Sequence, residues 1–262
     1  MRNIVPELER IIRDRLIGWP PDWEGYHWPG YTYEHTLRVR DLALTLAERE
    51  RADPDVVLLA ALLHDIRKDS GRDHAEVGAN EAGRILKDLG VSDRISARVC
   101  EAISLHSGSN TPDSPVESLC LGDADFIDGN FGIVAVWRFL TIRSGHGHPL
   151  METIEEMRSW LPRKEQLLVS PGPHTRGGRE IARQRAARMQ VFADALLDAS
   201  QAKANGHGPG LMDLAACIHG HCGRTLLTEQ FADFDRLAAT EDADPILGAV
   251  CRSVRLEVAG KH

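Results

Sequence analysis

The 262-residue sequence lacks any apolar run that approaches the roughly 20 residues needed to span a bilayer. Its first ten residues carry charges at positions where a secretory signal would need an apolar core. We therefore expect a soluble, cytoplasmic protein that has no membrane partner.

Cysteine is also scarce. The five cysteines, Cys100, Cys120, Cys217, Cys222 and Cys251, form neither an even set nor a regularly spaced one, so no disulfide scaffold is expected. Two of them flank a pair of histidines in the stretch Cys217-Ile218-His219-Gly220-His221-Cys222, which is a candidate site for structural zinc. No second cluster at finger-like spacing accompanies it, which disfavours zinc.

An excess of basic residues is absent too, because 39 acidic residues outnumber 31 basic ones and give a formal net charge of -8. This balance argues against a nucleic-acid surface, although small anionic ligands remain compatible through local focusing of the field. Aromatic residues make up only 5%, so the core must be mainly aliphatic. Abundant alanine and leucine favour helices. Phosphate-binding loops, dinucleotide fingerprints and Gly-x-Ser-x-Gly elbows do not occur.

Caps and helix breakers divide the chain into segments. The segment from Trp19 to Tyr33 is predicted to be an ordered loop, either a lid over the core or a wall of a substrate pocket. Residues 1–200 are expected to form the main domain, residues 201–210 a linker, and residues 211–262 two or three helices packed on or appended to that domain. Helices are predicted over residues 6–17, 33–50, 54–65, 73–89, 92–106, 115–129, 131–143, 150–160 and 176–200.

An adjacent histidine and aspartate, His64 and Asp65, end an apolar run, from Val56 to Leu63, that should be buried. Burying an ionisable pair is unfavourable unless a hydrogen-bond network or a cation compensates it. A metal is the simpler solution. Imidazole and carboxylate suit Mn, Fe, Co, Ni and Zn alike, so the residues indicate a class of metal only. Further candidate ligands, each on or beside a predicted helix, are His35, His74, His106 and Asp125.

In their order along the chain these residues resemble the HD superfamily of metal-dependent phosphohydrolases. The family pattern is a His, a His-Asp doublet, up to two further His and a distal Asp. The match covers roughly residues 30–130. The resemblance implies an all-α HD-domain helical bundle with additional C-terminal helices, in which residues 1–200 form the hydrolase domain.

The resemblance also implies two divalent transition-metal ions. His35, His64, Asp65 and Asp125 would hold the first ion, and Asp65 would bridge to a second ion held by His74 and His106. Family members with a single metal lack one or both of the second-site ligands.

Asp123 competes with Asp125 for the distal ligand position. Two residues apart on a helix, their side chains cannot point the same way. The stretch Ala124-Asp125-Phe126-Ile127 resembles the distal motif of the family and favours Asp125. Asp123 is then expected to support the ligands, and Asp128 to lie near the helix cap.

Cations near the predicted site are candidates for binding phosphate. Lys68 stands where His-Asp-x-x-Lys members of the family place a phosphate-facing cation, and its alternative role is a solvated lysine at a helix end. Arg38 lies one turn after His35 and is expected to reach the same pocket. Four later arginines do not share one helix face, so most should be solvated: Arg179, Arg183, Arg185 and Arg188.

The resemblance implies a phosphohydrolase in which a metal-bound hydroxide attacks a small phosphate ester, a cyclic phosphodiester or a nucleotide pyrophosphate. Asp65, Lys68 and Arg38 are the expected catalytic residues. The same ligand set is found in mixed-valent di-iron oxygenases of this superfamily, and a non-catalytic nucleotide sensor is the third alternative. The expected partner is a small phosphorylated substrate or nucleotide, with nucleic acid disfavoured and a homodimer allowed.

Overall fold

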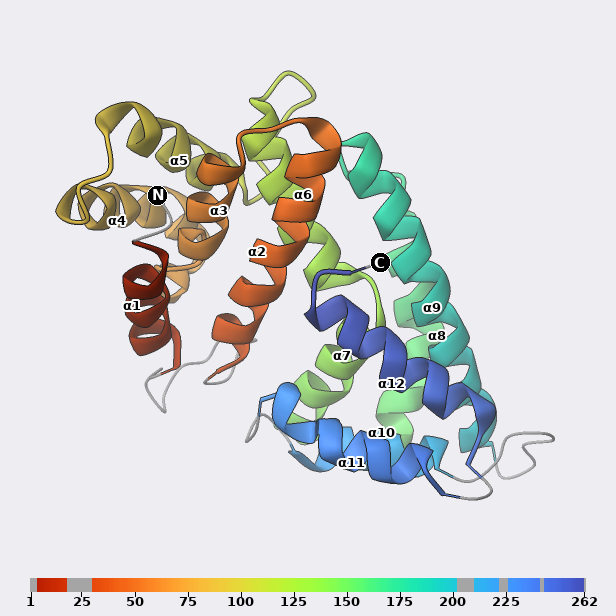
Figure 1. Cartoon of the computed structure of the whole chain (residues 1–262). Coiled ribbons are helices and arrows are strands. Elements are labelled where there is room, and N and C mark those ends of the chain that lie inside the picture. The colour runs from red at the N-terminus through yellow and green to blue at the C-terminus, as the bar shows by residue number, and fades with distance from the viewer. Residues whose placement is uncertain (1–3, 18–29, 202–209, 222–225, 241–242, 262) are drawn as a thin grey trace.

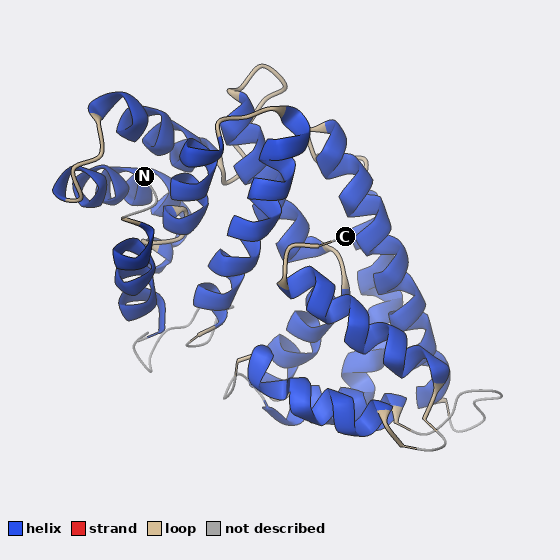
Figure 2. Ribbon diagram, viewed as in Figure 1, coloured by secondary structure: helices blue, strands red, loops and turns tan. Residues whose placement is uncertain are grey.

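The computed structural model describes residues 4–17, 30–201, 210–221, 226–240 and 243–261. Over these residues the fold is all-α and contains no strand, which confirms the predicted class (Figure 2). The α-helices are α1 (Val5–Ile17), α2 (Tyr31–Glu50), α3 (Pro54–Leu63), α4 (His74–Asp88), α5 (Asp93–Leu105), α6 (Val116–Asn130), α7 (Ile133–Gly145), α8 (Leu150–Gln166), α9 (Arg176–Ser200), α10 (Leu211–His221), α11 (Phe231–Ala238) and α12 (Pro245–Val258), with short 3-10 helices η1 (Lys68–Asp73) and η2 (Thr228–Gln230).

Helices α2 and α6 pack against each other at the centre of the molecule (Figure 1). Helices α1, α3, α4 and α5 gather on one side of this pair, and α7, α8 and α9 on the other. The C-terminal helices α10 and α12 contact both α7 and α9. In the described part of the chain after residue 210, the three α-helices α10, α11 and α12 therefore pack on the rest of the chain.

Local sequence signals account for several helix ends. Asp53 caps α3 by accepting a hydrogen bond from the Asp55 amide at 3.1 Å, and Pro54 occupies the first turn as predicted. Asp73 makes no side-chain cap bond at the start of α4, contrary to the capping box that its spacing indicates. Helix α8 runs through Pro162 to Gln166 rather than ending at residue 160, because buried packing on this turn overrides the proline.

A buried carboxylate joins the C-terminal helix to the start of α7. Glu257 is fully buried and accepts hydrogen bonds from the Ile133 and Val134 amides at 3.1 and 3.0 Å. Gly132 precedes them with φ of 105°, and a Cβ there would collide with the Glu257 carboxylate. A helix N-terminus with free amides is a favourable place for an acidic side chain. This contact anchors α12 to the main body.

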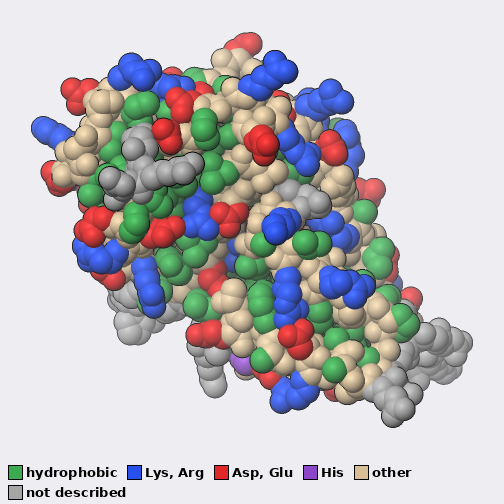
Figure 3. Space-filling view, viewed as in Figure 1, with side chains coloured by type: hydrophobic (Ala, Val, Ile, Leu, Met, Phe, Trp, Pro, Cys, Tyr) green, Lys and Arg blue, Asp and Glu red, His purple; other side chains and the backbone are tan. Residues whose placement is uncertain are grey.

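The surface is mixed in charge. On the face shown in Figure 3, acidic and basic side chains are interspersed and histidine is almost absent. No helix among the described residues is long and apolar enough to cross a membrane. Most of the predicted Trp19–Tyr33 loop and of the 201–210 linker lies outside the described residues, although α2 already begins at Tyr31.

Candidate metal centre

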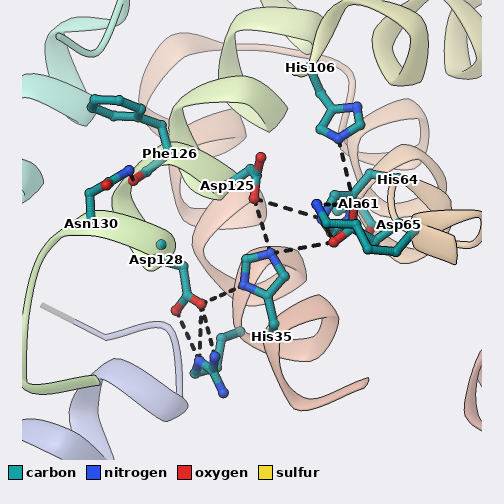
Figure 4. A network of polar contacts seen from close by, with 12 residues as sticks. His35, Ala61, His64, Asp65, His106, Asp125, Phe126, Asp128 and Asn130 are labelled. Carbon is teal, nitrogen blue, oxygen red and sulfur yellow. Dashed lines mark hydrogen bonds and ion pairs between the residues drawn. The ribbon is translucent and has the colours of Figure 1, made fainter. Parts of the chain in front are cut away.

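The structure brings the six predicted ligands into one cluster. Figure 4 shows five of them, and the sixth is His74. The four histidines and Asp65 are buried, and Asp125 is half-buried. The six ligands lie on or just after five helices, and the His64-Asp65 doublet directly follows the apolar helix α3. His35 lies on α2, His64 and Asp65 follow α3, His74 starts α4, His106 ends α5, and Asp125 lies on α6.

Asp65 stands in the middle of the cluster, with its two carboxylate oxygens facing different histidines. Oδ2 lies 3.5 Å from Nε2 of His64 and 3.8 Å from Nε2 of His35. Oδ1 lies 3.6 Å from Nε2 of His74 and 3.8 Å from Nε2 of His106. The Asp65 carboxylate therefore lies between two pairs of imidazoles.

Asp125, and not Asp123, faces the histidines. Asp125 Oδ1 lies 3.0 Å from His35 Nε2 and 3.9 Å from His64 Nε2. Asp123 instead accepts hydrogen bonds from the amides of His174 and Thr175, both at 2.7 Å, and from the Thr175 hydroxyl at 2.6 Å. Asp123 therefore holds the turn before α9.

The four histidines are all oriented through Nδ1. In His64, His74 and His106, Nδ1 donates to the backbone carbonyl three residues earlier, at 2.8, 2.8 and 2.6 Å. In His35, Nδ1 lies 2.7 Å from Asp128 Oδ2. A carbonyl can only accept, so in His64, His74 and His106 Nδ1 carries a proton and Nε2 points into the cluster. Such outer hydrogen bonds fix the tautomer and ring orientation of metal-binding histidines.

Several of the inward-facing atoms have no partner. Nε2 of His64, Nε2 of His106 and Oδ2 of Asp65 are buried without a hydrogen bond. Leaving buried polar atoms unpaired costs free energy unless something else binds them. Imidazole nitrogens and carboxylate oxygens converging in this way fit divalent transition-metal ions. Two groups of close donors, His35 with His64 and Asp125, and His64 with Asp65 and His106, match this chemistry.

Burial and neighbouring charges shift the pKa values in this cluster. Burial lowers the pKa of His64 to about 4, which keeps it neutral and able to bind metal. Burial also opposes protonation of His35, but its hydrogen bonds to Asp125 and Asp128 prevail and raise its pKa to about 10. The pKa of Asp65 falls well below its ordinary value despite burial, because Lys68 and the histidines favour the carboxylate.

Asp128 is a residue of this site that the sequence analysis missed, because it was expected near a helix cap. It is fully buried, one helical turn after Asp125, and contacts both His35 and Arg38. Asp128 is three residues after Asp125, so both lie on one face of α6. This spacing was the sequence signal that could have identified Asp128 as part of the site.

Arg38 lies on the Nδ1 side of His35, where both contact Asp128, and not on the Nε2 side that faces Asp65. Its Nε and Nη2 donate to Asp128 at 2.9 and 3.0 Å, and its side chain is buried. The expectation that Arg38 faces substrate is therefore corrected: its guanidinium neutralises Asp128. Arg185 is fully buried as well, with Nη1 3.7 Å from Asp128, so it is not among the solvated members of the four later arginines.

Lys68 lies at the edge of the cluster, in η1. Its Nζ donates to Asp65 Oδ1 at 3.0 Å and lies 3.4 Å from His74 Nε2. One fifth of its side chain is exposed. The ammonium group is thus oriented toward the cluster and is not a solvated helix end.

A second group of donors occurs in the C-terminal segment. Cys217 Sγ lies 3.9 Å and His221 Nε2 3.5 Å from Asp233 Oδ2. Asp233 is already paired with Arg236, and Cys222 lies outside the described residues. We assign no ion to this group.

Comparisons with known proteins agree with this geometry. Residues 32–130 match the HD domain family model. YpgQ of Bacillus subtilis is 30% identical over 126 residues, which make up 46% of this chain and 61% of YpgQ. The chain spans between 17% and 61% of the curated relatives it matches.

Solved structures share the fold. A predicted HD superfamily hydrolase from an uncultured Thermotogales bacterium has a TM-score of 0.51 at 26% identity, over 74% of this chain and 91% of that one. Bacillus subtilis YpgQ in complex with ADP has a TM-score of 0.56 at 23% identity, over 74% and 94% of the two chains. The match to YpgQ at this identity is a match of fold.

Proposed function

Because residues 32–130 match the HD domain family model, we propose that the chain belongs to the HD superfamily and is a metal-dependent phosphohydrolase with a dinuclear centre. The observation that carries this proposal is the position of Asp65 between two sets of histidines. His35, His64 and Asp125 would hold one ion with Asp65, while His74 and His106 would hold the other. Two ions bound there would polarise a phosphoryl oxygen and lower the pKa of a water molecule.

The protein side chains have separate roles in this proposal. Lys68 neutralises negative charge that develops on the phosphoryl oxygens, because its ammonium lies beside Asp65 at the edge of the cluster. Asp128 orients His35, and Arg38 keeps Asp128 ionised in a buried environment. Asp128 and Arg38 are therefore positioning residues, and neither has to touch the substrate.

The substrate class is a small phosphate ester, a cyclic phosphodiester or a nucleotide pyrophosphate. The ADP in the YpgQ structure supports testing nucleotides first. The decisive experiment is metal analysis of protein purified without chelator, followed by a phosphate-release screen over ADP, ATP, cyclic AMP and sugar phosphates.

The screen is run both in air and with oxygen excluded. We expect release of phosphate or pyrophosphate that persists without oxygen when Mn or Co is supplied. Oxygen uptake by iron-loaded protein, with no release from any phosphorylated compound, would instead identify a di-iron oxygenase. Tight nucleotide binding without turnover under either atmosphere would identify a sensor.

A further inference from the structure

A pocket of about 720 Å³ lies between α7 and α8, beside the C-terminal end of α6. We call it the α7–α8 pocket. Four of the side chains that line it are cationic and none is acidic: Arg138, Arg143, Arg163 and Lys164. Phe139 and Trp160 form another part of the wall, with ring centroids 4.8 Å apart. The formal net charge of the whole chain is -8, so the local charge of this pocket is opposite in sign to that of the chain.

Three of these cations, Arg138, Arg163 and Lys164, form no ion pair with an acidic side chain of the described residues. The fourth, Arg143, pairs with Glu156. Arg138 donates one bond, to the Gly129 carbonyl at 2.9 Å, and its Nε is buried without a partner. Lys164 donates to the Asn130 amide oxygen at 2.6 Å.

The electrostatic environment of Lys164 is unfavourable for its own charge. Burial, together with the charges of Arg138 and Arg163, lowers the pKa of Lys164 to about 8. Clustered like charges without a counter-charge destabilise a protein, and a bound anion removes that cost. The pocket is therefore better suited to an anion than to a neutral ligand.

The pocket begins one side chain away from the metal ligands. The Tyr31 ring stacks on His35, with centroids 5.9 Å apart, and the Arg138 guanidinium lies 5.6 Å from the same ring. Burial and the positive charge of Arg138 lower the pKa of Lys68, but Asp65 and Asp125 prevail and raise it. Lys164 is tied to α6, the helix that carries Asp125, through Asn130.

We propose that the α7–α8 pocket binds the distal anionic group of a substrate that has more than one phosphoryl group, while another phosphoryl group reacts at the metal cluster. Arg138 and Lys164 provide the contacts. This inference rests on the proposed function and narrows its substrate class to phosphoanhydrides, such as nucleoside diphosphates and triphosphates, over phosphate monoesters.

The test measures binding without turnover. ADP and AMP are titrated into protein with EDTA present throughout, and the heat of binding is recorded. Lys164→Met should weaken ADP binding by about tenfold or more, since a hydrogen bond to a charged group is lost. Lys164→Arg should retain the affinity of the wild type, which also shows that the site is folded. Lys87→Met, an exposed lysine on α4, is the matched control and should change nothing.

Equal ADP affinity in wild type and Lys164→Met, or no ADP binding by the wild type, would overturn the inference. A loss of binding in Lys164→Met with no hydrolysis of any compound would leave the pocket standing and reject the proposed hydrolase. Hydrolysis of ADP with a KM that Lys164→Met leaves unchanged would support the proposed hydrolase and reject the role of the α7–α8 pocket.

Discussion

Asp128 Oδ2 lies 2.7 Å from Nδ1 of His35, while Asp125 Oδ1 lies 3.0 Å from Nε2 of the same ring. The two carboxylates, one helical turn apart on α6, therefore hold opposite edges of one imidazole. Only the Nε2 edge faces Asp65 and the other histidines. Asp128 consequently determines the orientation of His35 and leaves its inner nitrogen for a metal ion.

Removing the orienting carboxylate should weaken metal binding. In Asp128→Ala, His35 loses the acceptor at Nδ1 and Arg38 is left buried without its partner. We expect the affinity for the first ion to fall about 10- to 100-fold. Metal titration followed by calorimetry measures this. Asp123→Ala is the control: it should lower thermal stability by loosening the turn before α9, yet keep the metal affinity. Unchanged metal affinity in Asp128→Ala would contradict the positioning role.

The two-ion assignment predicts different stoichiometries for different ligands. Asp65→Ala should lose both ions, because each of its oxygens faces one half of the cluster. His74→Ala and His106→Ala should lose about half of the metal and keep the first ion. Elemental analysis of each variant after dialysis against Mn measures the number of ions bound per protein. A full complement of metal in Asp65→Ala would reject the bridging role.

Metal binding should release a proton near neutral pH. Hydrogen bonds to two carboxylates raise the pKa of His35 to about 10 in the metal-free protein, so its Nε2 carries a proton that an ion must displace. About one proton per first ion should therefore be released at pH 7.5, and metal affinity should rise with pH. Calorimetry in two buffers of different ionisation enthalpy counts the protons. Identical heats in both buffers would show that His35 is already neutral.

The same pKa has an effect of known sign on the stability of the metal-free protein. A folded-state pKa of about 10, above the ordinary 6.5, means that the folded state binds the proton more tightly than the unfolded state. The contribution of His35 to stability is complete below pH 6.5 and is lost as pH rises through 10. Denaturation in the presence of EDTA should show a lower free energy of unfolding at pH 9 than at pH 6. His35→Gln should abolish the part of this difference that His35 contributes.

Lys68 should affect turnover and not metal content. Lys68→Met removes the ammonium group beside Asp65 but leaves all six ligands in place. We expect stoichiometric metal and a loss of about 10- to 1000-fold in kcat/KM for the substrate found in the screen. Lys68→Arg should recover part of the activity. If the metal is lost together with the activity, Lys68 stabilises the ligands and does not act on substrate.

The C-terminal segment should be required for stability through Glu257. Glu257→Gln removes the negative charge that faces the buried Arg185 and nearby Arg188. Breaking such a buried charge interaction should lower the free energy of unfolding by about 3–5 kcal/mol. Urea denaturation of the metal-loaded protein measures it. Glu101→Gln, on the exposed face of α5, should stay within about 0.5 kcal/mol of wild type.

Much of the site can be recognised in the sequence because its ligands follow local rules. An ionisable doublet at the end of an apolar run signals compensation by a metal, and the capping residue and proline before α3 place that doublet at a helix end. The order of the six ligands then resembles the family pattern, in agreement with the match of residues 32–130 to the HD domain model. The helical class depends on composition and periodicity, which are also local properties.

The tertiary structure alone decides which side chains meet. Periodicity places Asp125 and Asp128 on one face of α6, but only the packing of α6 against α2 directs one to Nε2 and the other to Nδ1 of His35. The same packing places Arg38 on the Nδ1 side of His35 and buries Arg185, because a buried carboxylate requires cations nearby. The α7–α8 pocket likewise combines residues of separate helices whose spacing in the sequence carries no signal. Local sequence thus encodes which residues can bind metal, and helix packing determines how they are held.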